Sequence, residues 1–268
     1  MNAEQNVESV HVEIDGPVCV VTIDRPQARN TMSEAMLAAL RQELERLAAH
    51  KRIRAVVLAA NGPAFSAGHD LKELTGHRAD PDHGHSYIRQ IMESCSAVML
   101  AILRLPQPVI AAVEATATAA GCQLVATCDL AVASSNAKFC TPGVHIGLFC
   151  STPMVALSRN VGRKHAMEML FTGDMVSADD AYRIGLVNRV VAPGAAREEA
   201  LQLARKIAAK SAAVVRLGKE AFYRQLEMNV VDAYNYANEV MLKNMMARDA
   251  EEGMSAFVEK RTPVWEDR

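Results

Sequence analysis

Two segments of the chain could bind and polarise a carbonyl oxygen, because they place small residues where backbone amides must be approached. The first segment covers residues 64–74 and directly follows an apolar run. The second covers residues 108–124 and carries Ala119, Ala120 and Gly121 at the predicted start of a helix. Free amides at the positive end of a helix can hold an anionic oxygen. Small residues are also typical of tight packing between a strand and a helix, so composition leaves both interpretations open.

A third segment gathers, within nine residues, five side chains of types that bind metals. They lie on a loop-like stretch and are His77, Asp80, Asp82, His83 and His85. A metal centre needs its ligands held on a rigid scaffold by further hydrogen bonds. A solvated loop does not provide such support, and we predict no metal.

Other common catalytic signatures are absent from the sequence. It contains no G-x-G-x-x-G, G-x-x-x-x-G-K-[ST], G-x-S-x-G or H-E-x-x-H pattern. Their absence argues against dinucleotide binding, P-loop phosphoryl transfer, serine hydrolysis and zinc proteolysis. The six cysteines form no C-x-x-C pair and lie mostly in apolar runs, so we predict buried thiols and no catalytic cysteine.

The composition is that of an ordinary globular protein. Of the 268 residues, 50% are hydrophobic and 22% are charged, which is enough to bury one large core without disulfides. A formal charge of −2 offers no basic field for nucleic acid, and no apolar stretch is long enough to span a membrane. Residues 1–8 are polar and acidic, unlike a signal or transit peptide. We therefore predict a cytoplasmic protein with neither nucleic acid nor membrane as a partner.

The elements that must position the first two segments alternate between strand and helix. Residues 7–14 and 18–23 predict a hairpin, and Ser33 predicts the cap of a helix whose leucine stripe extends to residue 49. Residues 54–60 predict a buried strand. The pattern continues with a helix at 87–104, a strand at 109–113, a helix at 121–127 and a strand at 130–133. Such alternation is typical of an α/β fold.

The chain beyond residue 152 is predicted to be almost entirely helical. A long block from 195 to 258 is interrupted near Ser211, Asn229 and Gly253. We predict a core over residues 1–200 and a C-terminal helical oligomerisation region over residues 201–268. The latter carries an apolar stripe that a neighbouring subunit is expected to cover, formed by Phe222, Tyr223, Leu226, Val230 and Val231.

Several motifs, in order along nearly the whole chain, together resemble the enoyl-CoA hydratase/isomerase (crotonase) family. They are Arg25-Pro26 with Asn30, residues 65–74, residues 108–113, Gly121-Cys122-Gln123-Leu124 with Cys128-Asp129, residues 170–173, Ala181 with residues 185–187, and residues 252–261. The resemblance implies a crotonase-like β-β-α superhelix with a C-terminal helical layer, assembled as a homotrimer or hexamer. It also implies an acyl-CoA thioester as ligand, with coenzyme A as part of the substrate and no separate cofactor.

In that family two backbone amides hold the thioester oxygen as it gains enolate charge, and the resemblance places them at His69 and Ala120. Ala120 stands where the family usually has glycine, but alanine keeps its N–H. One such donor stabilises a transition state by about 2.7–4 kcal/mol. The resemblance therefore implies a retained oxyanion hole.

The proton-transfer groups depart from the family pattern. Family hydratases use two glutamates, and the matching positions hold Gln123 and Gly143, which cannot transfer protons. General acid–base assistance contributes about 10²–10⁴-fold, so ordinary hydratase activity is expected to be weak. The side chains that could substitute are His69, His145, Glu114 and Asp70, although a lone histidine such as His145 is more often structural.

Coenzyme A recognition is also implied by the resemblance. The residues assigned to it are Arg25, Gln27, Ala28, Arg29, Leu71, Lys72, Phe257 and Lys260. Arg29 and Lys260 are the cations chosen for the phosphates, against the alternative of ordinary surface charge.

Three functions remain open on the sequence. The first is an enolate-stabilising lyase or isomerase of the hydratase/isomerase type. The residues 65–70 also resemble the methylmalonyl-CoA decarboxylase branch, so a malonyl-type acyl-CoA decarboxylase is the second. The third is a non-catalytic acyl-CoA-binding homologue, because fold resemblance alone does not assign chemistry.

Overall fold

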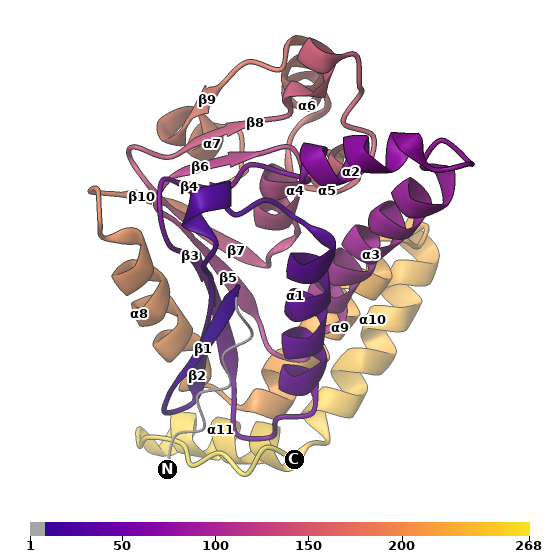
Figure 1. Ribbon diagram of the computed structural model, residues 1–268. Helices are drawn as coiled ribbons and strands as arrows, with labels where there is room; N and C mark the ends of the chain where they lie inside the picture. Colours follow the sequence, from indigo (N-terminus) through magenta and orange to yellow (C-terminus); the bar gives the residue numbers. More distant parts are fainter. Residues whose placement is uncertain (1–8) are drawn as a thin grey trace.

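The larger of two sheets carries the hairpin predicted at the start of the chain (Figure 1). The computed structural model describes residues 9–268. The strand order is β1-β2-β3-β5-β7-β10, with β1 antiparallel to β2 and every other pair parallel. The strands are β1 (Val10–Asp15), β2 (Val18–Ile23), β3 (Ala55–Ala60), β5 (Val109–Val113), β7 (Leu130–Ser134) and β10 (Arg189–Val191). The predicted start of the first strand at residue 7 lies outside the described residues.

A second sheet stands at the carboxyl ends of these parallel strands and was not predicted. Its order is β4-β6-β8-β9, formed by β4 (Ala64–Ser66), β6 (Thr116–Thr118), β8 (Lys138–Cys140) and β9 (Val176–Ser177). Along the chain β3 leads into β4, β5 into β6 and β7 into β8. Each turn of the chain thus adds one strand to each sheet before a helix returns. This repeat confirms the predicted β-β-α superhelix.

Helices cover both faces of the larger sheet (Figure 1). On one face lie α1 (Glu34–Ala48) and α3 (His85–Arg104), and on the other lies α8 (Ala196–Ala208). The predicted cap of α1 is present, because the Ser33 side chain accepts the Met36 amide at 3.2 Å. Every fourth residue of α8 from Ala196 to Ala208 is a buried alanine, which lets this helix lie close against the strands. The core therefore extends through α8 to Ala208, beyond the boundary predicted at residue 200.

Shorter helices surround the second sheet. They are η1 (Pro26–Ala28), α2 (Leu71–Gly76), η2 (His77–Ala79), α4 (Ala120–Thr127), η3 (Pro142–Ile146), α5 (Pro153–Asn160), α6 (Arg163–Thr172) and α7 (Ala178–Arg183). All eight residues of α4 are buried. This helix is therefore part of the core and packs against α3, α5, β4 and β6.

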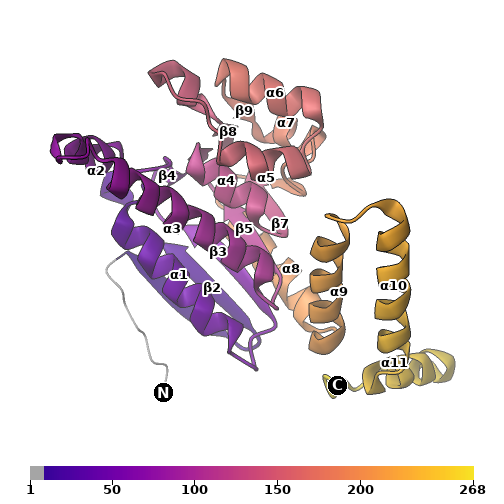
Figure 2. The same ribbon diagram turned by 90° about the vertical axis from the view of Figure 1, so that its right-hand side faces the viewer.

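Three helices at the end of the chain project from this body (Figure 2). They are α9 (Ala212–Gln225), α10 (Val230–Met245) and α11 (Arg248–Glu259). Ser211 and Asn229 cap α9 and α10 as predicted. The third break lies at Ala247 and not at the predicted Gly253, which is inside α11. Neither α9 nor α10, both fully described, has a buried residue.

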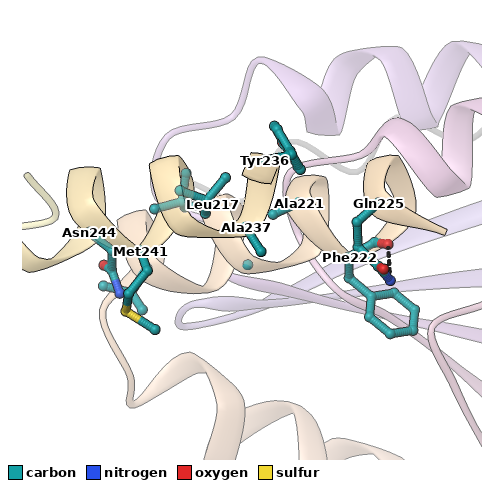
Figure 3. A pocket seen from close by; sticks show the side chains of 11 residues that line it. Leu217, Ala221, Phe222, Gln225, Tyr236, Ala237, Met241 and Asn244 are labelled. Carbon is teal, nitrogen blue, oxygen red and sulfur yellow. Dashed lines mark hydrogen bonds between the residues drawn. The ribbon is translucent and has the colours of Figure 1, made fainter. Parts of the chain in front are cut away.

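A groove of about 300 Å³ runs between α9 and α10 (Figure 3). Leu217 and Ala221 of α9 face Ala237 and Met241 of α10 across it. Phe222, part of the predicted apolar stripe, is 56% exposed at one end of the groove. The apolar side chains of these two helices thus lie partly in the groove and partly in solvent.

Candidate active site

The two segments singled out in the sequence meet where β4 and β6 lie side by side. A Cβ built on Gly68 would lie 3.4 Å from the Ala120 nitrogen. One built on Gly121 would lie 2.3 Å from the Ser66 carbonyl oxygen, so glycine is required where the start of α4 presses on β4. Of the two interpretations left open by composition, tight packing therefore holds at this contact, and access to the amides stays a prediction.

The amides of His69 and Ala120 face no acceptor in the surrounding turns. The first hydrogen bond of α4 runs from the Gln123 amide to the Ala119 carbonyl at 2.9 Å, so the Ala120 amide precedes the helical ladder. Beside it, the Met32 amide donates to the Gly68 carbonyl at 2.8 Å and holds the loop that carries His69. Over residues 9–268, neither the His69 nor the Ala120 amide donates to a backbone carbonyl of a turn, loop or cap. Two amides on neighbouring backbone segments are thus left without such an acceptor within the described residues.

The imidazole of His69 is held in the same region without a hydrogen-bond partner. Both ring nitrogens are buried, and neither has a partner within the described chain. Burial lowers the pKa of His69 below its ordinary value of 6.5, and a contact with the Met32 backbone, outside ordinary hydrogen-bond geometry, opposes this shift. The ring is therefore neutral at neutral pH, with one nitrogen able to accept a proton.

The two positions that correspond to the family glutamates provide no carboxylate. Gln123 is 5% exposed, and its side-chain oxygen is buried without a partner among the described residues. Gly143 lies in η3, where a Cβ would come within 2.9 Å of the Leu148 carbonyl oxygen and 3.0 Å of the Cys150 sulfur. A longer side chain at residue 143 would therefore require the backbone to move.

Among the side chains proposed to replace the family glutamates as proton carriers, Glu114 already caps a helix. Its carboxylate accepts the amides of Gly194 at 2.9 Å, Ala196 at 2.6 Å and Arg197 at 3.3 Å, and so caps α8. Negative charge is favourable at a helix start, which fixes this carboxylate there.

Asp70 and His145 are engaged as well. Asp70 caps α2 by accepting the Lys72 amide at 3.1 Å, and it also accepts the Thr31 hydroxyl at 3.1 Å. His145 is exposed and its Nε2 lies 2.7 Å from the Thr172 carbonyl oxygen, as expected of a structural histidine. Of the four side chains suggested by sequence as proton carriers, His69 alone has no side-chain hydrogen bond within the described residues.

Most of the predicted coenzyme A residues cluster on neighbouring loops. Arg25 lies 3.8 Å from the Asp70 carboxylate, which joins η1 to the start of α2. The side chains of Gln27, Arg29, Leu71 and Lys72 are exposed on these two elements, while Ala28 is half-buried.

Phe257 and Lys260 do not belong to that cluster within one chain. Both lie at the end of α11, and Figures 1 and 2 place this helix at the opposite end of the molecule from α2. Phe257 is 85% exposed there. A single chain therefore does not bring the eight predicted residues together, because the C-terminal helices turn away from the superhelix.

Two side chains of the loop that carries metal-binding residue types have local partners. His77 stacks on Tyr87 with ring centroids 3.5 Å apart and lies 2.7 Å from Asp80. Across residues 9–268, no three His, Cys, Asp or Glu side chains are placed to share a metal ion.

All six cysteines are buried and unpaired, and burial raises the pKa of Cys140 to about 11. No described helix is long and apolar enough to cross a membrane.

Two residues that shape the site were not assigned a role from sequence. Asn30 accepts the Arg25 amide at 2.7 Å and donates to the carbonyls of Asn61 and Ala64, each at 2.8 Å. It thereby ties η1 to the strand that leads into the site, and only its place in a family motif marked it. Ala119 has a φ of 49°, for which an alanine gives no sequence signal.

Comparison with known proteins identifies the family of the chain. The sequence model of the family described as enoyl-CoA hydratase/isomerase matches residues 13–268. A Rattus norvegicus protein named enoyl-CoA hydratase domain-containing protein 3, mitochondrial, is 48% identical over 245 residues, which are 91% of this chain and 80% of that protein.

Solved structures agree over nearly the whole chain. A crystal structure of enoyl-CoA hydratase from Mycobacterium smegmatis has a TM-score of 0.91 at 56% identity and covers 96% of this chain and 98% of that chain. One of the human enoyl-CoA hydratase domain-containing protein 3 has a TM-score of 0.91 at 45% identity, covering 96% of this chain and 100% of that chain.

The predicted cytoplasmic location is contradicted by the comparisons. Five vertebrate relatives, 44–48% identical to this chain, are all named as mitochondrial proteins. The prediction rested on the polar, acidic character of residues 1–8, a local property that does not determine location, and these residues lie outside the described structure. The fold and the family are confirmed: the chain belongs to the enoyl-CoA hydratase/isomerase family.

Proposed function

We propose that the chain binds an acyl-CoA thioester, stabilises its enolate between the amides of His69 and Ala120, and moves the α-proton with the His69 imidazole. The observation that carries this proposal is the pairing of two available amides with an adjacent imidazole whose ring nitrogens are buried and unpartnered within the described chain. Buried polar groups are normally satisfied, and those that are not often serve a ligand.

The reaction begins when the thioester oxygen accepts hydrogen bonds from both amides. The hydrogen bonds strengthen as the oxygen gains charge, and each contributes about 2.7–4 kcal/mol to the transition state. The neutral His69 ring then accepts the α-proton, and the resulting imidazolium returns a proton to the enolate. The lowered pKa of His69 keeps the ring in its basic, neutral form at neutral pH.

One proton-transfer group suffices for exchange at the α-carbon or for moving a double bond, but not for ordinary hydration. Hydration needs one group to activate water and another to supply a proton. Gln123 can orient a water through its free oxygen, yet an amide does not exchange protons at neutral pH. We therefore expect weak hydration of crotonyl-CoA.

The same features suit decarboxylation of a malonyl-type thioester as a second candidate. Loss of carbon dioxide gives the same enolate and needs a proton donor without a water-activating pair. Gln123 and Gly143, standing where glutamates would repel a substrate carboxylate, favour this candidate. Release of carbon dioxide from methylmalonyl-CoA would distinguish it from proton transfer alone.

Coenzyme A is proposed to bind as part of the substrate beside η1 and α2, with Arg29 facing its phosphates. Because Phe257 and Lys260 lie far from this cluster in one chain, we propose that α11 of a second copy supplies them in a trimer or hexamer. The exposed apolar side chains of α9 and α10 support such an assembly.

Deuterium exchange tests the proposed function without assuming a physiological substrate. Butyryl-CoA incubated with the protein in D₂O should gain deuterium at its α-carbon, measured by mass spectrometry. Ala120→Pro removes one amide at the first position of α4, where proline fits a helix, and should reduce exchange by about 10²–10³-fold. Circular dichroism must show an unchanged helix content in this variant. No exchange above the rate without protein would refute the proposal.

A further inference from the structure

Ala119 has a backbone conformation that an L-amino acid side chain resists. Its φ is 49° and its ψ is −116°, and it is the N-cap residue of α4, directly before the proposed donor at Ala120. In this region the Cβ crowds the residue's own backbone, so glycine normally occupies it. Other residues persist there when the surrounding structure holds them, and such residues gather at functional sites.

Two contacts hold Ala119 in this conformation. Its amide donates to the carbonyl of Cys140, the last residue of β8, at 3.0 Å. Its methyl group faces Gly68, because a Cβ built on Gly68 would lie 2.9 Å from it. Gly68 immediately precedes His69, which carries the other proposed donor. The methyl group of Ala119 therefore fills the space between the two donor segments, while Cys140 fixes the start of α4.

We propose that Ala119 is a positioning residue whose strained backbone and methyl group set the spacing of the His69 and Ala120 amides. This inference rests on the proposed function, since the spacing matters when both amides hold one thioester oxygen. A glycine at residue 119 would relieve the strain and leave a gap the size of a methyl group beside Gly68. The strained conformation thus lowers the stability of the fold and keeps the oxyanion hole rigid.

Stability provides the first measurement. Ala119→Gly should unfold at a temperature about 2–12 °C above that of the control Ala195→Gly. Ala195 is a matched control because it is the N-cap of α8 with a φ of −102°, so its replacement removes a methyl group without relieving strain. Both proteins are compared at the same concentration, because assembly would shift the unfolding temperature.

The second measurement reports the oxyanion hole directly. The absorbance of cinnamoyl-CoA moves to longer wavelength when its conjugated carbonyl accepts hydrogen bonds, and this shift requires no turnover. Wild type and Ala195→Gly should both produce the red shift at saturation, and Ala119→Gly should lose most of it. Exchange of the butyryl-CoA α-proton should fall by roughly 10-fold to 100-fold in Ala119→Gly, because misplaced donors stabilise the enolate poorly.

The outcomes separate this inference from the proposed function. A full red shift in Ala119→Gly, or an unfolding temperature at or below that of Ala195→Gly, would overturn the positioning role while wild type still showed the shift. No red shift in wild type with bound cinnamoyl-CoA would instead refute the oxyanion hole itself.

Discussion

Replacing Lys219 with methionine should detach α9 from the core. The Lys219 ammonium lies 2.6 Å from the Asp129 carboxylate and 3.0 Å from each of the carbonyls of Ile102 and Gln107. Its side chain is 7% exposed, and burial lowers its pKa although Asp129 opposes this. The Tyr223 hydroxyl donates to the other carboxylate oxygen at 2.8 Å. These contacts join α9 to the α/β core.

The expected loss follows from leaving the Asp129 carboxylate buried without its cation. Removing one partner of a buried ion pair destabilises a protein by about 3–5 kcal/mol. For a chain of this size that corresponds to a fall of about 6–20 °C in Tm. Lys206→Met makes the same chemical change at an exposed residue of α8 and should shift Tm by less than about 2 °C.

Calorimetry at one protein concentration gives both values, and limited proteolysis near residue 210 should cleave Lys219→Met faster than wild type. The double variant with Asp129→Asn should recover part of the loss, because no buried charge is then left unpaired. Equal Tm values for Lys219→Met and Lys206→Met would refute this account of how α9 is held.

Three further predictions follow from the site and the C-terminal helices. Gln123→Glu should raise crotonyl-CoA hydration in a coupled assay, whereas Gly143→Glu should lower Tm by about 2–12 °C because its Cβ would meet the Leu148 carbonyl. Arg29→Ala and Lys260→Ala should each weaken coenzyme A binding in calorimetry and make it less salt-sensitive, and unchanged affinity in both would contradict the assignment. Sedimentation at micromolar concentration should give a trimer or hexamer, and a monomer would contradict the proposed assembly.

The parts of the fold that were predictable from sequence are those set by local signals. Ser33 and the leucine stripe that follows it identify α1, and the strand predicted at residues 109–113 coincides with β5. Strands β4, β6 and β8 were missed because each has three residues, too few for an alternating pattern. The break predicted at Gly253 was wrong because a helix in contact with other structure tolerates glycine.

The candidate site was likewise predictable only where sequence motifs identified its residues. Family motifs pointed to His69 and Ala120, but sequence could not decide among the possible proton carriers. The commitment of Glu114 depends on the amide of Ala196, which lies 82 residues further along the chain. The strain at Ala119 depends on Cys140 and is equally invisible to local pattern. Contacts between distant segments decide which polar groups remain available.

The pH dependence of α-proton exchange in butyryl-CoA, compared between wild type and His69→Gln, tests the central claim most directly. The base acts in its neutral form, which dominates above its pKa. Since burial lowers the pKa of His69 below 6.5, wild-type exchange should stay constant at neutral pH and decline below pH 6.5. His69→Gln should lose about 10²–10⁴-fold of the rate and the acidic decline with it. Undiminished exchange in His69→Gln, or a wild-type decline that begins above pH 6.5, would contradict the role of His69 as the proton carrier.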